Sequence, residues 1–128
     1  MESLTTRSIS IKVVARYETE ASGPNQEKFV FSYQVTIENK GLDAVQLLDR
    51  HWIIVDADNV TREVKGPGVI GLQPVIDPGK QHTYNSWSVL RTPIGKMTGY
   101  YGMHNMQTGE SFQVKIPAFK LIADFVKN

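Results

Sequence analysis

The chain has 128 residues, of which 41% are hydrophobic and 21% are charged, so it has the size and composition of one ordinary globular domain. Fourteen basic and thirteen acidic residues leave a net charge of +1, which excludes recruitment of nucleic acid or a membrane surface by a global electrostatic field. The absence of cysteine excludes disulfides, thiolate metal ligands and a cysteine nucleophile.

The N-terminal segment MESLTTRSISIK lacks the apolar region of a signal peptide. No apolar run approaches the roughly 18 residues that a membrane-spanning helix needs. A chain without cysteine is also compatible with a reducing compartment. We therefore expect a cytoplasmic protein.

The first third of the chain alternates apolar and polar residues, which is the period of a strand with one buried face. One such run covers residues 9–17 and a second covers residues 29–37. The segment between them, ASGPNQEK, contains the glycine, proline and asparagine that are typical of turns. The two runs therefore predict a long β-hairpin.

Shorter apolar runs, separated by turn residues, follow along the rest of the chain. We find no capped stretch with apolar residues at helical spacing. Trp52 lies in mid-run, where immunoglobulin-like sandwiches often bury a tryptophan, although the paired cysteines of antibody domains are absent. About seven to nine strands in a chain of this length predict an all-β, antiparallel β-sandwich forming a single domain, residues 1–128. The further predicted strands are residues 45–48, 52–55, 60–65, 81–86, 97–106, 111–116 and 119–122.

The segment EVKGPGVIG places Gly66, Gly68 and Gly71 at the G-x-G-x-x-G spacing of a dinucleotide-binding turn. In that fold the glycines open a helix whose N-terminal N–H groups hold the pyrophosphate, and an acidic residue follows about twenty positions later. Here Pro74 and Pro78 follow, and no Asp or Glu occurs between residues 78 and 109. Rossmann-type dinucleotide binding is therefore excluded.

Two interpretations of the glycine stretch remain. Its successive N–H groups can form an anion-binding nest, with Arg62 and Lys65 supplying positive charge. Alternatively the glycines are structural, with a turn at Gly66–Gly68 and a close backbone approach at Gly71.

Residues that commonly carry catalysis or bind metals show no informative spacing. The three histidines, of which His51 is the first, lie 31 and 22 positions apart, unlike any zinc motif. Asp56 and Asp58 begin like a calcium loop, but the next positions lack the required oxygen ligand and glycine, so we predict a hairpin turn. No serine lies in a G-x-S-x-G elbow. We therefore predict no enzymatic activity, no cofactor and no metal site.

Aromatic residues outside the alternating rows are candidates for an interaction surface. Trp87 falls in the segment YNSWS, which we interpret as a loop, where it either anchors a partner or covers one end of the core. Tyr100 and Tyr101 are neighbours on a predicted strand, so one of them should point inward and the other outward. The outward tyrosine is expected to join Trp87 in one partner surface.

Many ordered segments match one known family. They are Phe31–Tyr33, Ile37–Asn39, Leu47–Ile54, Glu63–Pro74, Pro78–Gly79, Tyr84–Ser86, Thr92–Tyr101 and Ile116–Phe119. Through them the chain resembles the ApaG family, also called CorD, from about Ile9 to Leu121.

The resemblance implies an immunoglobulin-like or fibronectin type III-like β-sandwich, in agreement with the strand pattern. It also implies an association with magnesium and cobalt homeostasis, and similar domains in eukaryotic F-box proteins imply protein binding. The family's glycine motif, for which pyrophosphate binding has been suggested, corresponds to Gly66, Gly68 and Gly71. Two positions depart from the family: Trp87 stands where many members have glycine, and Tyr100 where many have histidine.

We therefore predict a non-enzymatic binding module that recognises a protein partner by edge-strand pairing or through loops around Gly66–Gly71 and Trp87. The main alternative is binding of pyrophosphate or a nucleotide phosphate on residues 66–71. A third is a weak Mg²⁺ or Co²⁺ site that uses His51 or the Asp56/Asp58 turn.

Overall fold

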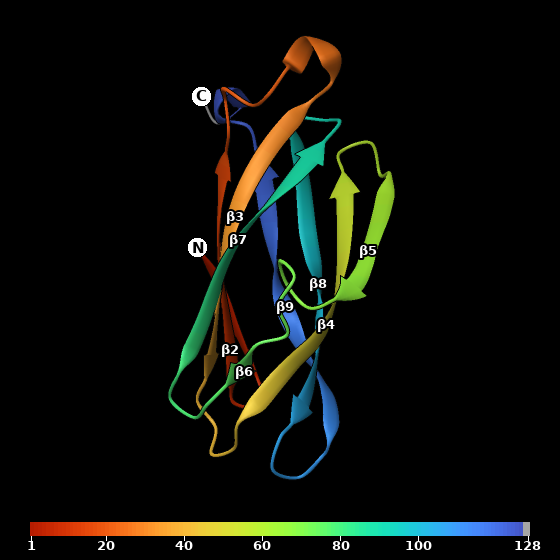
Figure 1. The fold of residues 1–128 in the computed structure, drawn as a ribbon. Coiled ribbons are helices and arrows are strands. Elements are labelled where there is room, and N and C mark those ends of the chain that lie inside the picture. Colours follow the sequence, from red (N-terminus) through yellow and green to blue (C-terminus); the bar gives the residue numbers. More distant parts are fainter. Residues whose placement is uncertain (127–128) are drawn as a thin grey trace.

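The computed structural model describes residues 1–126, which form nine strands in two packed antiparallel sheets (Figure 1). The first sheet has the order β1-β2-β3-β7, and the second has the order β5-β4-β8-β9 with the short β6 paired to β4. The strands are β1 (Glu2–Thr6), β2 (Ile9–Tyr17), β3 (Phe29–Asn39), β4 (Val45–Asp56), β5 (Thr61–Pro67), β6 (Val75–Ile76), β7 (Gln81–Leu90), β8 (Ile94–Asn105) and β9 (Ser111–Ile122).

This topology is the predicted fibronectin type III-like sandwich, so the fold class is confirmed. The helical segments of the described chain are two short 3-10 turns, η1 (Pro24–Gln26) and η2 (Asp124–Val126). No helix within residues 1–126 is long and apolar enough to cross a membrane.

The N-terminal hairpin forms as its alternating pattern predicts. β2 pairs with β3 in an unbroken register from Ile9 opposite Asn39 to Tyr17 opposite Phe31. Every second side chain then faces the opposing sheet, and these rows supply much of the hydrophobic core. The fully buried members are Ile9, Ile11, Val13, Phe31, Val35 and Ile37.

Trp52 joins the two sheets at the centre of the core. Its side chain is 3% exposed, and its ring lies 5.4 Å from Tyr33, 5.9 Å from Phe119 and 6.4 Å from Tyr101, in each case edge to face. This geometry is the favoured one for aromatic pairs, and it confirms the prediction of a buried mid-strand tryptophan.

Two pairs of predicted short strands are in fact single long strands. Residues 45–48 and 52–55 belong to β4, and residues 111–116 and 119–122 belong to β9. In β4 the pairing with β8 shifts between Leu47 and Asp49, and β8 shifts against β9 between Met97 and Gly99. Such irregularities reverse the inward and outward alternation, so the sequence period breaks although the strand continues.

Three further segments are strands that the sequence pattern did not reveal, one of which is the two-residue β6. β7 continues to Leu90, so Trp87 lies within a strand and the loop prediction is wrong. The inward positions beside it are Ser86 and Ser88, whose small polar side chains hid the alternation. β1 is an exposed edge strand of mostly polar residues, which carries no apolar period.

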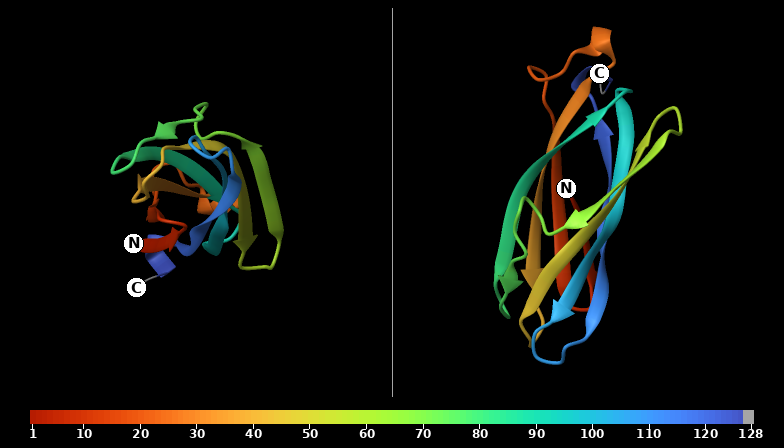
Figure 2. Two further views of the ribbon diagram at one scale, coloured as in Figure 1. Left: turned by 90° about the horizontal axis from the view of Figure 1, so that it is seen from below. Right: turned by 45° about the vertical axis from the view of Figure 1, so that its right-hand side comes forward.

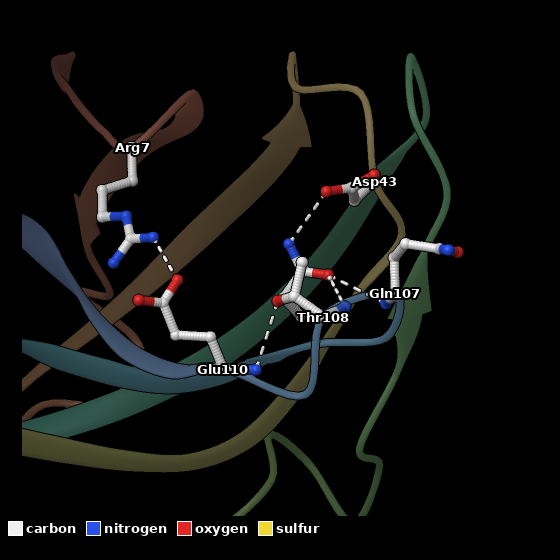
Figure 3. Close-up of polar contacts among 6 residues, drawn as sticks. Arg7, Asp43, Gln107, Thr108 and Glu110 are labelled. Carbon is white, nitrogen blue, oxygen red and sulfur yellow. Dashed lines mark hydrogen bonds and ion pairs between the residues drawn. The ribbon is translucent and has the colours of Figure 1, made fainter.

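The turns at one end of the sandwich are held by polar contacts (Figure 3). The Glu110 amide donates to the Thr108 hydroxyl at 3.2 Å, and Asn105 Oδ1 accepts from the amides of Gln107 and Thr108 in the turn between β8 and β9. Arg7, in the turn between β1 and β2, forms an ion pair with Glu110. These contacts link the turns of the two sheets.

The two sides of the sandwich differ. On one side β1 and β2 lie against β9, and the N-terminus lies on this closed side (Figure 2). On the other side β5 and β7 are the edge strands, and the side chain of Arg62 reaches across to donate to the Val89 carbonyl at 2.6 Å. We call this second side, between β7 and the segment of residues 61–72, the open seam.

The first prediction concerns Gly68, which has a φ of 63° and whose added Cβ would lie 2.2 Å from the Leu72 carbonyl oxygen. Gly109 has a φ of 79°, but an added Cβ there would meet open space. It is therefore a matched control that isolates the cost of the left-handed backbone conformation. We expect Gly109→Ala to lower the free energy of unfolding by about 1–2 kcal/mol and Gly68→Ala by several kcal/mol, because only Gly68 adds a clash. Urea unfolding measures both, and equal losses would contradict the assigned role of Gly68.

Candidate functional site

The glycine stretch forms a tight hairpin and does not begin a helix. The Val69 amide donates to the Leu72 carbonyl at 2.8 Å, and the Leu72 amide donates back at 3.0 Å. Both central residues have positive φ, 47° at Ile70 and 74° at Gly71, as in a type I′ turn. The geometry agrees with the exclusion of a Rossmann site. It also places a β-branched residue in a conformation that such residues rarely adopt.

Each of the three glycines in the motif is required by a different local contact or backbone conformation. At Gly66 an added Cβ would lie 3.2 Å from the guanidinium of Arg50, so glycine leaves room for that side chain. Gly68 allows the close approach of the Leu72 carbonyl, and Gly71 takes the second left-handed position of the turn. This agrees with the structural interpretation of the motif.

The loop offers fewer free N–H donors than an anion nest over residues 66–71 needs. The Gly68 amide donates to the Leu48 carbonyl at 2.8 Å, and the amides of Val69 and Leu72 bond each other's carbonyls. Within residues 1–126, the loop amides without a hydrogen-bond partner are those of Ile70 and Gly71.

The two cations predicted from the sequence do not gather at the glycine loop. Arg62 lies opposite Ile54, far along β5 from Gly68. Its guanidinium already donates a hydrogen bond to the Val89 carbonyl. Lys65 pairs with His51 on the outer face of the second sheet, with its Nζ 3.9 Å from Glu63 Oε2. Because Arg62 and Lys65 differ by an odd number of positions, they point to opposite faces of β5.

The cation that does lie at the loop is Arg50. Its side chain is half-buried on the inner face of β4, and its Nη1 donates to the carbonyls of Pro67 and Gly68, each at 3.0 Å. Within residues 1–126 no carboxylate oxygen lies within 4.0 Å of its guanidinium. The sequence carried a usable signal, because Arg50 stands two positions before the buried Trp52 and must share its face.

A cavity of about 250 Å³ opens beside Arg50 at the open seam. It lies between the loop and β7, and three of its lining residues are aromatic. Its lining residues are Tyr33, Arg50, Trp52, Pro67, Val69, Ile70, Gly71, Tyr84 and Ser86. The lining therefore contains one cation and several hydroxyls but no carboxylate, imidazole or thiol.

Three tyrosines around Arg50 are held in the protonated state. Burial raises the pKa of Tyr33, and the Ser86 hydroxyl and the Arg50 charge oppose that rise. Burial also raises the pKa of Tyr84 and Tyr101, whose hydroxyls bond each other across the two sheets. At neutral pH these groups are hydrogen-bonding phenols, and none is activated as a base or a nucleophile.

Trp87 and Tyr100 lie on opposite sides of the molecule. Trp87 pairs with Ser32 on the outer face of the first sheet and is 60% exposed. Tyr100 pairs with His51 on the outer face of the second sheet and is 36% exposed, whereas Tyr101 is fully buried. The expected inward and outward division of the two tyrosines is confirmed. The expectation that the outward tyrosine joins Trp87 in one surface is wrong, because the sandwich separates them.

The residues considered for a metal site are also dispersed. His51 Nε2 lies 3.5 Å from Glu63 Oε2 on the outer face of the second sheet. Asp56 is buried and accepts from the Arg91 amide at 3.0 Å, while Asp58 caps the exposed turn by accepting from the Val60 amide at 3.2 Å. The described residues contain no cluster of three or more His, Cys, Asp or Glu side chains that could hold a metal ion.

Comparison with known proteins identifies one family. The model of the ApaG domain matches residues 19–105. The Protein ApaG of Acidithiobacillus ferrooxidans is 51% identical over 96% of both chains, and that of Pseudomonas paraeruginosa is 50% identical over 91% of this chain and 92% of its own. A crystal structure from Bordetella pertussis, described as ApaA, superposes with a TM-score of 0.87 at 40% identity, covering 91% of this chain and 94% of that one.

The second prediction concerns the buried phenols Tyr84 and Tyr101. An unfolded tyrosine ionises near pH 10, whereas burial raises the folded pKa of both groups above that value. Their stabilising contribution is therefore complete below about pH 10 and is lost as pH rises further, because the unfolded chain then releases protons first.

Ultraviolet titration of tyrosinate, followed beside circular dichroism, checks this behaviour. We expect the ionisation of Tyr84 and Tyr101 to be delayed until the fold is lost and that of Tyr33 to be shifted above its ordinary pKa, with one fewer delayed phenol in a Tyr84→Phe control. Ionisation of all five tyrosines near pH 10 with the fold intact would contradict the buried pair.

Proposed function

This chain belongs to the ApaG domain family, and we propose that it is a non-enzymatic binding module that captures another protein by adding a strand to the edge of β7. The main support for this proposal is the composition and exposure of β7, the strand at that edge. β7 is a long edge strand without charges, prolines or bulges, and it carries the exposed Trp87.

The other three edges of the described sandwich are protected against strand addition. β5 carries charged residues along its length and ends in Pro67, and β9 contains two lysines, Pro117 and a register shift. β1 is only five residues long. Natural proteins use such charges, prolines, irregularities and short strands to prevent edge pairing. β7 has none of these, which supports its use as a docking edge.

The free side of β7 presents backbone groups that an incoming strand can pair with. The Val89 carbonyl accepts from Arg62 across the seam, so it points away from β3. In an antiparallel ladder alternate residues direct both backbone groups to the same side. Thr83, Asn85 and Trp87 therefore also direct their N–H and C=O groups to the free edge, where residues 1–126 give them no hydrogen-bond partner.

Trp87 supplies a side-chain anchor next to these groups. Its side chain stands on the outer face of the edge strand, where a neighbouring strand would place its own outward side chains beside the indole. Tryptophan is strongly enriched among residues that dominate the energy of protein interfaces. Main-chain pairing would give affinity and the indole would give specificity, as in other strand-addition complexes.

The non-enzymatic part of the proposal rests on the lining of the open seam. That lining has no carboxylate, imidazole or thiol for acid–base or nucleophilic chemistry. A cytoplasmic setting and the family's association with magnesium and cobalt homeostasis stay predictions. Binding of pyrophosphate on the glycine loop itself is less favoured, because the amides of Gly68, Val69 and Leu72 already have partners.

The third prediction compares two aromatic truncations on opposite faces. Trp87→Ala should weaken capture of the partner by about 2 kcal/mol or more, because it removes an interface anchor without removing core contacts. Tyr100→Ala is the matched control on the other sheet and should leave capture unchanged. Quantitative affinity capture from cell extract measures both, and a loss with Tyr100→Ala but not with Trp87→Ala would contradict the assignment of the face.

A proline at the free edge tests strand addition separately from the tryptophan. Asn85→Pro removes an N–H that points away from β3, so no ladder bond is lost, but an incoming strand loses one of its partners. We expect capture to fail while circular dichroism stays that of the folded protein. Undiminished capture by a folded Asn85→Pro variant would rule out pairing at this edge.

A further inference from the structure

Arg50 is an unusual cation for the inside of a β-sandwich. A half-buried guanidinium normally has a carboxylate partner, because removing a charge from water without one is costly. Arg50 instead uses only Nη1, for the Pro67 and Gly68 carbonyls. Its Nε and Nη2 have no hydrogen-bond partner among residues 1–126, and Arg50 is one of the residues that line the cavity at the open seam.

We propose that this cavity is a receptor for a compact oxyanion, a phosphate or carboxylate group, held by Arg50 with the hydroxyls of Tyr33, Tyr84 and Ser86. The site is distinct from the β7 edge that carries the proposed protein binding, and it stands if that proposal fails. It also differs from an anion nest on the glycine loop, because its donors are side chains of β3, β4 and β7.

The chemistry of the lining matches an oxyanion. A guanidinium presents a fork of N–H donors that fits carboxylate and phosphate oxygens, and such charge-assisted bonds are the strongest hydrogen bonds that side chains make. The hydroxyl groups of the lining are neutral donors at physiological pH. No acidic residue lines the cavity, and the neighbouring Asp49 points away, with its carboxylate lying over Gly102 on the outer face of the second sheet.

The shape of the cavity limits the ligand to a small group. Its volume of about 250 Å³ is below the roughly 300–1,000 Å³ of sites that enclose drug-sized ligands, so it suits an anion and not a whole nucleotide. The rings of Trp52 and Tyr33 form an apolar wall, which lowers the local dielectric and strengthens an ion pair with Arg50. Ile70 and Gly71 at the loop tip also line the cavity.

The test is isothermal titration calorimetry at near-physiological salt, with inorganic pyrophosphate and glutarate as separate titrants. Arg50→Gln removes the charge but keeps an amide donor for the loop carbonyls. Ser86→Leu fills the cavity with apolar atoms and leaves those carbonyl contacts untouched. Lys65→Gln and Arg62→Gln are matched controls, because each removes one positive charge from the neighbouring strand but neither side chain lines the cavity.

We expect saturable binding that Arg50→Gln and Ser86→Leu each weaken about tenfold or more, while the controls change it less than about twofold. Tighter binding of pyrophosphate assigns the site to phosphate compounds, and tighter binding of glutarate assigns it to carboxylates, including those of a protein partner. Either result supports the receptor. If Arg50→Gln does not fold, the effect of Ser86→Leu on binding alone decides whether the receptor proposal stands. Absence of saturable binding at millimolar concentration, or an equal loss in the Lys65→Gln or Arg62→Gln control, overturns the proposal.

Discussion

The open seam is organised by the hydrogen bonds from Arg50 Nη1 to the carbonyls of Pro67 and Gly68. They hold the glycine loop across the space between the sheets, and Gly66 has no side chain because the guanidinium occupies that position. On this side the space between the sheets is therefore lined by a charged side chain as well as by aromatic rings. The glycine loop and the cavity thus share one half-buried guanidinium that has no carboxylate partner among residues 1–126.

The two sides of the sandwich therefore have different physical roles. On the closed side, apolar rows of β2 and β9 pack together and stabilise the fold by burial. On the open side the sheets meet through polar groups, namely the hydroxyls of Tyr84 and Tyr101 and the contact of Arg62 with the Val89 carbonyl. Polar contacts are easier to exchange for ligand or partner contacts than a packed core is, so the open side is the region suited to recognition.

Local alternation was enough to predict the hairpin of β2 and β3, the burial of Trp52 and the opposite orientations of Tyr100 and Tyr101. It failed where the chain changes register, as at Leu48 in β4, and where small polar residues occupy inward positions, as beside Trp87. The choice of Arg62 and Lys65 as site residues relied on nearness in sequence, whereas pairing of β4 with β5 brings Arg50 to the loop. Such contacts depend on register between strands, which no single segment of sequence specifies.

Ligand binding by this domain is proposed to occur along the open seam and not on the glycine loop alone or the outer face of the second sheet. Amide NMR of the wild-type protein, titrated with pyrophosphate, tests it most directly because every described strand reports in one spectrum. We expect saturable shifts at Arg50, at Ile70 and Gly71, and from Tyr84 to Ser86, as binding along the open seam requires. Shifts confined to residues 61–66 or to the surroundings of His51 and Tyr100, or an unchanged spectrum at millimolar pyrophosphate, would contradict it.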